Sequence, residues 1–130
     1  GCAEVSVAAE LTRRIDVIEA GYEYLLAYAA QGRQDDTGSE VRARLAGMRD
    51  ALHDLGALVA QRAGESSSAA TEAAAFLGAV DTDARTAHGA ISLVLSRPAI
   101  SSLLVDNLNA SIHVRALLTD LFLVDQALKA

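Results

Sequence analysis

The sequence has very few of the residues that interrupt helices or favour sheets. Of its 130 residues one is proline, Pro98, none is tryptophan, and only 4% are aromatic. Proline breaks helices, and aromatic residues are enriched in strands. The apolar residues, 52% of the chain, are mostly Ala, Leu and Val. Because Ala and Leu are among the strongest helix formers, the composition predicts an all-α protein.

Cysteine, clustered basic residues and long apolar runs are also scarce. Cys2 is the only cysteine, which rules out an intramolecular disulfide and favours a cytoplasmic location. No run reaches the roughly 18 apolar residues of a transmembrane segment. The net charge is −6 and the basic residues are scattered, whereas binding to nucleic acid requires clustered Lys and Arg. We therefore expect neither a nucleic-acid partner nor a transmembrane segment.

The chain begins with Gly1-Cys2 and not with methionine. We expect this dipeptide to be a remnant of expression. The alternative is a processed end, in which Cys2 is the acylated residue that follows a lipoprotein signal.

Apolar residues recur at alternating spacings of three and four along four segments, which keeps one face of an α-helix apolar. The four stripes are Ala8, Leu11, Ile15, Ile18, Tyr22, Leu25 and Ala29; Val41, Leu45, Met48, Leu52, Leu55 and Val59; Ala73, Leu77, Val80, Ala84, Ala87, Ile91 and Val94; and Ala110, Val114, Leu117, Leu121, Val124 and Leu128. Each stripe predicts one helix, of about 25–30 residues in a chain of this length.

Turn residues separate the four predicted helices. Gly32 is placed to end the first helix, the segment 37–40 reads as a capping box for the second, and 63–68 is a polar connector. Pro98 marks the last boundary and suits the first turn of the following helix. Connectors of about 5–8 residues return each helix beside its predecessor. We therefore predict one domain, residues 1–130, folded as an antiparallel up-down-up-down four-helix bundle about 40 Å long.

The third predicted helix is weak in its middle. Gly78 and Gly89 each cost about 1 kcal/mol relative to alanine in a helix interior. The cluster 81–83, Asp-Thr-Asp, can cap a new helix and so divide this element in two. The apolar register continues across the cluster, which favours a single helix.

The fourth predicted helix is apolar on every side around residues 121–124, and residues 91–95 nearly repeat this pattern. A helix on the surface of a monomer shows a polar face to water. We therefore expect the protein to associate, with a homodimer favoured, through the third and fourth helices. The expected interface residues are Ile91, Leu95, Leu118, Phe122 and Leu123. The alternative is a short stretch fully enclosed within one bundle.

Asp50 and His53 have the spacing of metal ligands on a helix. Both lie off the stripe formed by Met48, Leu52 and Leu55, and a di-iron bundle needs a second such pair together with further carboxylates. We expect an exposed local ion pair here, no metal and no cofactor.

His88 and His113 border their apolar stripes. Antiparallel helices place residue 88 at the height of residues 110–113, with Met48 at a similar height on the second helix. A polar layer of Glu19, Tyr22, His88, Asn109 and His113 is therefore a candidate ligand-binding or acid–base site inside the bundle. The alternative is that these side chains sit half-exposed at helix edges.

No phosphate-binding loop, nucleophile elbow or zinc-ligand set occurs in the sequence. Tyr22, Tyr24 and Tyr28 cluster on the first helix, and we expect them to pack at an interface. The leading functional hypothesis is a non-catalytic, self-associating module for scaffolding, regulation or adaptor binding. The alternative is a small-molecule or enzymatic site around Tyr22, Glu19, His88 and His113. A helical chaperone of flagellar or secretion type fits the size and the acidity equally well.

Overall fold

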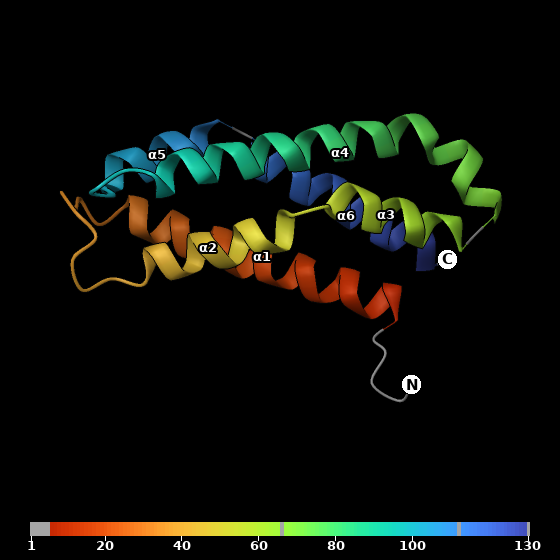
Figure 1. The fold of residues 1–130 in the computed structure, drawn as a ribbon, viewed down its shortest axis with the longest axis horizontal. Coiled ribbons are helices and arrows are strands. Elements are labelled where there is room, and N and C mark those ends of the chain that lie inside the picture. The colour runs from red at the N-terminus through yellow and green to blue at the C-terminus, as the bar shows by residue number, and fades with distance from the viewer. Residues whose placement is uncertain (1–5, 66, 112, 130) are drawn as a thin grey trace.

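The computed structural model describes residues 6–65, 67–111 and 113–129. These residues form helices and no strands, which confirms the all-α prediction. Figure 1 shows the helices lying along the long axis of the molecule. Their bounds are α1 Val7–Ala29, α2 Val41–Leu52, α3 Leu55–Gly64, α4 Ser67–Leu95, α5 Ser102–Ala110 and α6 His113–Lys129.

The prediction of four continuous helices is wrong at two places. The second predicted helix is divided into α2 and α3 at His53 and Asp54, where Asp54 has a left-handed φ of 53°. The fourth is divided into α5 and α6 after Ser111. Neither break carries a proline. Aspartate tolerates the left-handed conformation better than most residues, so the chain turns at Asp54 without a glycine.

The third predicted helix is continuous. α4 runs from Ser67 to Leu95, so the cluster 81–83 does not divide it. Thr82 and Thr86 each donate their hydroxyl to the carbonyl four residues earlier, on Gly78 and Thr82 respectively, which ties these side chains to the helix backbone. The single-helix reading of this segment is confirmed.

The apolar stripes form one continuous core. Every member of the second stripe is buried, on both sides of the break between α2 and α3. The spacing of three from Leu52 to Leu55 crosses the break without moving the stripe to another face. α4 contributes Val80, Ala84, Ala87, Ile91 and Val94, and α6 contributes Val114, Leu117, Leu121 and Val124. The periodicity therefore predicted most of the side chains that enter the core, although Ala110 is exposed and Tyr28, outside the first stripe, is buried.

Local signals at the helix ends were less reliable. The capping box at 37–40 does not form, because the Thr37 amide donates to Asp35 Oδ1 and the Glu40 amide donates to the Tyr24 hydroxyl. α5 begins after Ser101, whose hydroxyl accepts from the Leu104 amide, so Pro98 lies in the connector and not in a first helical turn. Gly32 does adopt the left-handed conformation expected beyond α1.

Hydrogen bonds tie the two connectors at one end of the molecule to each other. The buried hydroxyl of Tyr28 donates to the carbonyl of Ile100 at 2.5 Å, and the Ser102 hydroxyl donates to the carbonyl of Tyr28 at 2.7 Å. Asp36 accepts from the Ile100 amide and from Arg42 Nε at 2.7 Å. The pKa of Asp36 is lowered, first by the hydrogen bond from Arg42 and then by that from the Ile100 amide. This end is closed by specific polar contacts.

Candidate functional site

The break between α2 and α3 opens a pocket against the middle of α4. His53 ends α2, and its backbone carbonyl accepts a hydrogen bond of 2.6 Å from Arg14 Nη1 on α1. Asp54 caps α3 without a side-chain hydrogen bond to the helix. Its carboxylate instead lies 3.2 Å from His53 Nε2. The sequence predicted an ion pair between His53 and Asp50, and the structure pairs His53 with its neighbour Asp54.

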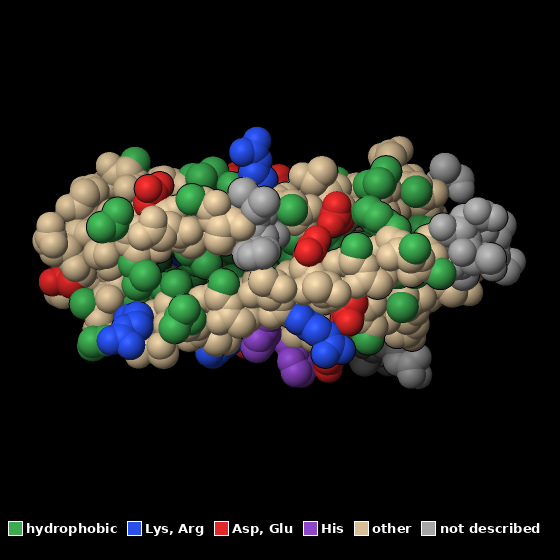
Figure 2. All heavy atoms as spheres, turned by 90° about the horizontal axis from the view of Figure 1, so that it is seen from above, with side chains coloured by type: hydrophobic (Ala, Val, Ile, Leu, Met, Phe, Trp, Pro, Cys, Tyr) green, Lys and Arg blue, Asp and Glu red, His purple; other side chains and the backbone are tan. Residues whose placement is uncertain are grey.

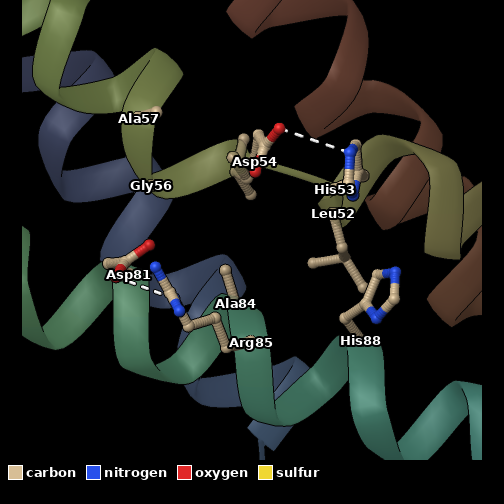
Figure 3. A pocket seen from close by; sticks show the side chains of 10 residues that line it. Leu52, His53, Asp54, Gly56, Ala57, Asp81, Ala84, Arg85 and His88 are labelled. Atoms are coloured by element: carbon tan, nitrogen blue, oxygen red, sulfur yellow. Dashed lines mark hydrogen bonds and ion pairs between the residues drawn. The ribbon is translucent and has the colours of Figure 1, made fainter.

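The pocket has a volume of about 240 Å³ and is lined by polar groups from both sides of the break. Figure 3 shows Asp81, Arg85 and His88 rising from α4 toward the chain around His53 and Asp54. Arg85 Nε lies 3.0 Å from Asp81 Oδ2. Apolar lining comes from Leu52, Leu55, Ala57 and Ala84. The pocket therefore combines two imidazoles, two carboxylates and one guanidinium.

The two histidines of the pocket come from different helices and lie beside each other. The ring centroids of His53 and His88 are 6.1 Å apart, and their planes are inclined by 45°. From the sequence, Met48 was expected to lie opposite residue 88. Met48 precedes His53 by five residues, which is about 7.5 Å along a helix. The connector between α1 and α2 occupies residues 30–40 and is longer than the expected 5–8 residues. On the face shown in Figure 2, histidines gather at one edge beside acidic and basic side chains.

A close approach between α3 and α4 shapes one wall of the pocket. Gly56 is buried, and a Cβ atom added to it would lie 2.1 Å from Asp81 Oδ1 and 2.6 Å from Asp81 Cβ. Only glycine fits at this spacing. The sequence patterns did not predict a site at Asp54, Gly56, Asp81 or Arg85. The one available signal was the run His-Asp-Leu-Gly at 53–56, which places turn-compatible residues inside an apolar stripe.

Of the predicted polar layer, His88 lines the pocket. Glu19 and Tyr22 are half-buried on α1, and the pocket that His88 lines contains neither of them nor Asn109. The amide nitrogen and oxygen of Asn109 are buried and have no hydrogen-bond partner in the described part of the chain. The side chain of His113 lies outside the described residues. The structure therefore brings His88 together with His53.

A second hollow is lined by the C-terminal part of α6, by residues 73–77 of α4 and by Ala63 of α3. It has a volume of about 300 Å³, and its lining is entirely apolar: Ala63, Ala73, Phe76, Leu77, Leu123, Val124, Ala127 and Leu128. We call this hollow the apolar groove. Leu123 is 59% exposed, and Phe122, the preceding residue, is 45% exposed. Large apolar side chains thus stand in and beside a groove that offers few polar contacts.

The predicted interface residues divide into two groups. Ile91 is fully buried and Leu118 is 5% exposed, so both lie in the core of the chain itself. Leu95 is half-buried, while Phe122 and Leu123 face outward. The exposed large apolar side chains of α6 are therefore Phe122 and Leu123. The residues of α4 that line the groove with Leu123 are Ala73, Phe76 and Leu77.

The tyrosines of α1 make contacts within the chain. Tyr28 is 1% exposed and belongs to the core, so the expectation that it packs at an interface is wrong. The rings of Tyr24 and Tyr28 stack with centroids 6.3 Å apart. Arg44 lies over the Tyr24 ring and Arg33 over the Tyr28 ring, both within cation–π range.

A pair of carboxyl groups faces across the contact between α4 and α6. The pKa of Asp120 on α6 is raised, first by burial and then by a hydrogen bond and charge repulsion from Asp83 on α4. A carboxyl group whose pKa is higher in the folded chain stabilises that chain below its unfolded pKa, near 3.8. This contribution is lost as the pH rises through the folded pKa.

We therefore expect Asp120→Asn to raise the free energy of unfolding at pH 7, because it removes the repulsion. Below about pH 4 the gain should shrink, since protonated Asp120 is then as neutral as asparagine. Urea denaturation between pH 3.5 and 8 measures the difference. Asp106→Asn on the exposed face of α5 is the control. A gain that does not change with pH would contradict the carboxyl pairing.

None of the described helices combines the length and the apolar character that a membrane crossing requires. Comparison of the chain with family models, with curated proteins and with solved structures finds no match. The pocket and the apolar groove are thus the features on which a function can be argued.

Proposed function

We propose that this protein is a non-catalytic helical module that forms a homodimer through the apolar groove and the outer face of α6. Its role would be scaffolding, regulation or adaptor binding. The observation that carries the proposal is the apolar groove, which lies beside the exposed side chains of Phe122 and Leu123. Exposed apolar surface of this kind marks sites of protein association.

The arrangement of the helices supports this reading. We infer an antiparallel up-down-up-down bundle of four rods, formed by α1, by α2 with α3, by α4, and by α5 with α6. α1 contacts α2 and α5, α3 contacts α4, and α4 also contacts α2 and α6. In such a bundle each rod keeps one outer face, and on α6 that face carries Phe122 and Leu123.

A second copy of the chain is the occupant that we favour for the groove. In a twofold dimer the same patch serves both subunits, so it must carry both a projection and a recess. α6 supplies both, because Leu123 lines the groove and Phe122 projects next to it. A stable interface takes about 800 Å² from each partner. This is about one ninth of the 7177 Å² surface of the chain.

Light scattering coupled to size-exclusion chromatography tests the dimer directly. We expect the wild-type chain to have twice the monomer mass at micromolar concentrations. Leu123→Asp should yield a monomer with unchanged helicity, because a buried charge at the interface costs several kcal/mol without affecting the core. Phe122→Asp should act in the same direction.

Leu103→Asp is the matched control, since Leu103 is 69% exposed on α5 and does not line the apolar groove. This variant should remain a dimer. A wild-type chain that is monomeric at about 100 µM would contradict the proposal, because a dissociation constant above that value corresponds to less than about 5.5 kcal/mol.

The alternative function is a small-molecule site around Tyr22, Glu19, His88 and His113. One observation supports it, namely the position of His88 in a pocket. His88 lines a pocket, but its neighbours there are His53, Asp81 and Arg85. Any ligand of His88 would therefore be held at the break between α2 and α3.

A further inference from the structure

We propose that the pocket at the break between α2 and α3 binds a divalent transition-metal ion, zinc, nickel or copper, through the imidazoles of His53 and His88. Imidazole is a preferred ligand of these three ions. The two rings come from α2 and α4 and lie with their centroids 6.1 Å apart. Figure 3 shows them on the same side of the pocket, with the side chain of Leu52 beside both rings. The site does not depend on dimer formation.

The carboxylate of Asp54 prepares His53 for this role. Asp54 Oδ2 lies 3.2 Å from His53 Nε2, close enough for the carboxylate to favour a proton on this nitrogen over one on Nδ1. The neutral ring then has its lone pair on Nδ1, which is free to bind a metal. Ligand histidines commonly donate their other nitrogen to a carboxylate, which fixes the tautomer and makes the ligand more basic. Asp54 is therefore a positioning residue.

The spacing of the rings requires only a small adjustment. Metal–nitrogen bonds of about 2.0–2.1 Å in tetrahedral geometry place two imidazole centroids about 5 Å apart. The observed separation is 6.1 Å. The side chain of His53 is 71% exposed and that of Asp54 is 78% exposed, so both can rotate together by about 1 Å toward His88. The core need not move.

The number of protein ligands sets the kind of site. Within the described residues no three side chains of His, Cys, Asp and Glu are placed to hold one ion. The two imidazoles would supply two ligands, and water would complete the coordination. A site with open positions exchanges its ion more readily than the closed four-ligand sites that build a fold.

The charges around the pocket favour a cation over an anion. Two carboxylates, on Asp54 and Asp81, line it, whereas Arg85 supplies the only guanidinium of the lining. The Arg85 guanidinium is held against Asp81 at 3.0 Å, which offsets its repulsion of a metal at the histidines. The net charge of the chain, −6, adds attraction at long range.

Binding would link two elements that the chain joins only through α3 and the following connector. His53 lies at the end of α2, where backbone geometry changes, and His88 lies within the continuous helix α4. An ion held by both would fix the break between α2 and α3 against α4. Because the ion binds the folded chain preferentially, the melting temperature should rise with metal concentration.

Isothermal titration calorimetry of the full chain with zinc and with nickel tests the proposal. We expect one ion per chain with micromolar affinity. His53→Ala and His88→Ala should each weaken binding more than tenfold, and Asp54→Asn should weaken it about tenfold by removing the partner of His53. Electron paramagnetic resonance of the copper-loaded chain should show two coordinated nitrogens, and one in either alanine variant.

Two control variants separate this site from other donors in the chain. His113→Ala and Cys2→Ser should leave both the affinity and the stoichiometry unchanged. Wild-type affinity in both His53→Ala and His88→Ala, or loss of binding in Cys2→Ser, would overturn the proposal. The absence of measurable binding by the wild-type chain at about 100 µM metal would do so as well. Light scattering of the alanine variants should still report the dimer, so failure of one proposal is distinguishable from failure of the other.

Discussion

Replacing Leu121 by alanine is expected to lower the free energy of unfolding by about 3 kcal/mol. Leu121 lies on α6 and is fully buried among the core residues. Truncation removes the transfer free energy of three carbon atoms and leaves a cavity that a close-packed core closes only in part. Since small domains are stable by about 5–15 kcal/mol, this one change removes a large share of the total.

Leu123→Ala is the matched control for Leu121→Ala, because it makes the same chemical change two residues away on the same helix. Leu123 is 59% exposed, so we expect its truncation to cost less than about 0.5 kcal/mol in the monomer. Guanidinium denaturation at low protein concentration, where a dimer dissociates, measures both values. Equal losses in the two variants would mean that α6 is buried on both faces within a single chain.

Gly56→Ala is expected to destabilise the fold by about 2 kcal/mol, although alanine is normally the better helix former. The added methyl group would lie 2.6 Å from Cβ and 2.7 Å from Cγ of Asp81. These atoms are close to the backbone of α4, so rotation of the Asp81 side chain cannot remove the clash. α3 and α4 must separate, which also opens the pocket around His53 and His88.

Gly64→Ala provides the control within the same helix. Gly64 is exposed at the end of α3, and an added Cβ would meet no atom of the described residues within 4 Å. We expect a gain of a few tenths of a kcal/mol from the lower backbone entropy of the unfolded chain. Thermal unfolding followed by circular dichroism should therefore show shifts of opposite sign for the two variants.

A double variant isolates the contact between Gly56 and Asp81. If the clash is with this side chain, Asp81→Gly should be less harmful in the Gly56→Ala background than in the wild-type chain. The difference is the coupling energy of a double-mutant cycle, and residues in direct contact typically show about 0.5–3 kcal/mol. Additive effects would show that the cost of Gly56→Ala arises elsewhere.

The core was predictable because it depends on local periodicity. A spacing of three and four residues places side chains on one helix face wherever the helix packs, so Leu45, Val59, Ile91 and Leu117 are buried as expected. The continuity of α4 through residues 81–83 followed from the same rule. The helical class of the described chain and most of its core were thus determined by the amino-acid sequence alone.

The breaks and the sites were decided by tertiary structure. Asp54 has a left-handed conformation that aspartate tolerates but does not require, so the turn-compatible run at 53–56 permits a break between α2 and α3 without determining one. His53 lies beside His88 because of the axial position of α2 along α4, and a sequence pattern contains no measure of that position. Tyr28 can be buried because its hydroxyl donates a hydrogen bond to the carbonyl of Ile100, which is 72 residues away in the sequence. Periodicity determines which face of each helix is apolar, whereas the axial positions of the helices, which bring side chains together into a site, arise only when the helices pack.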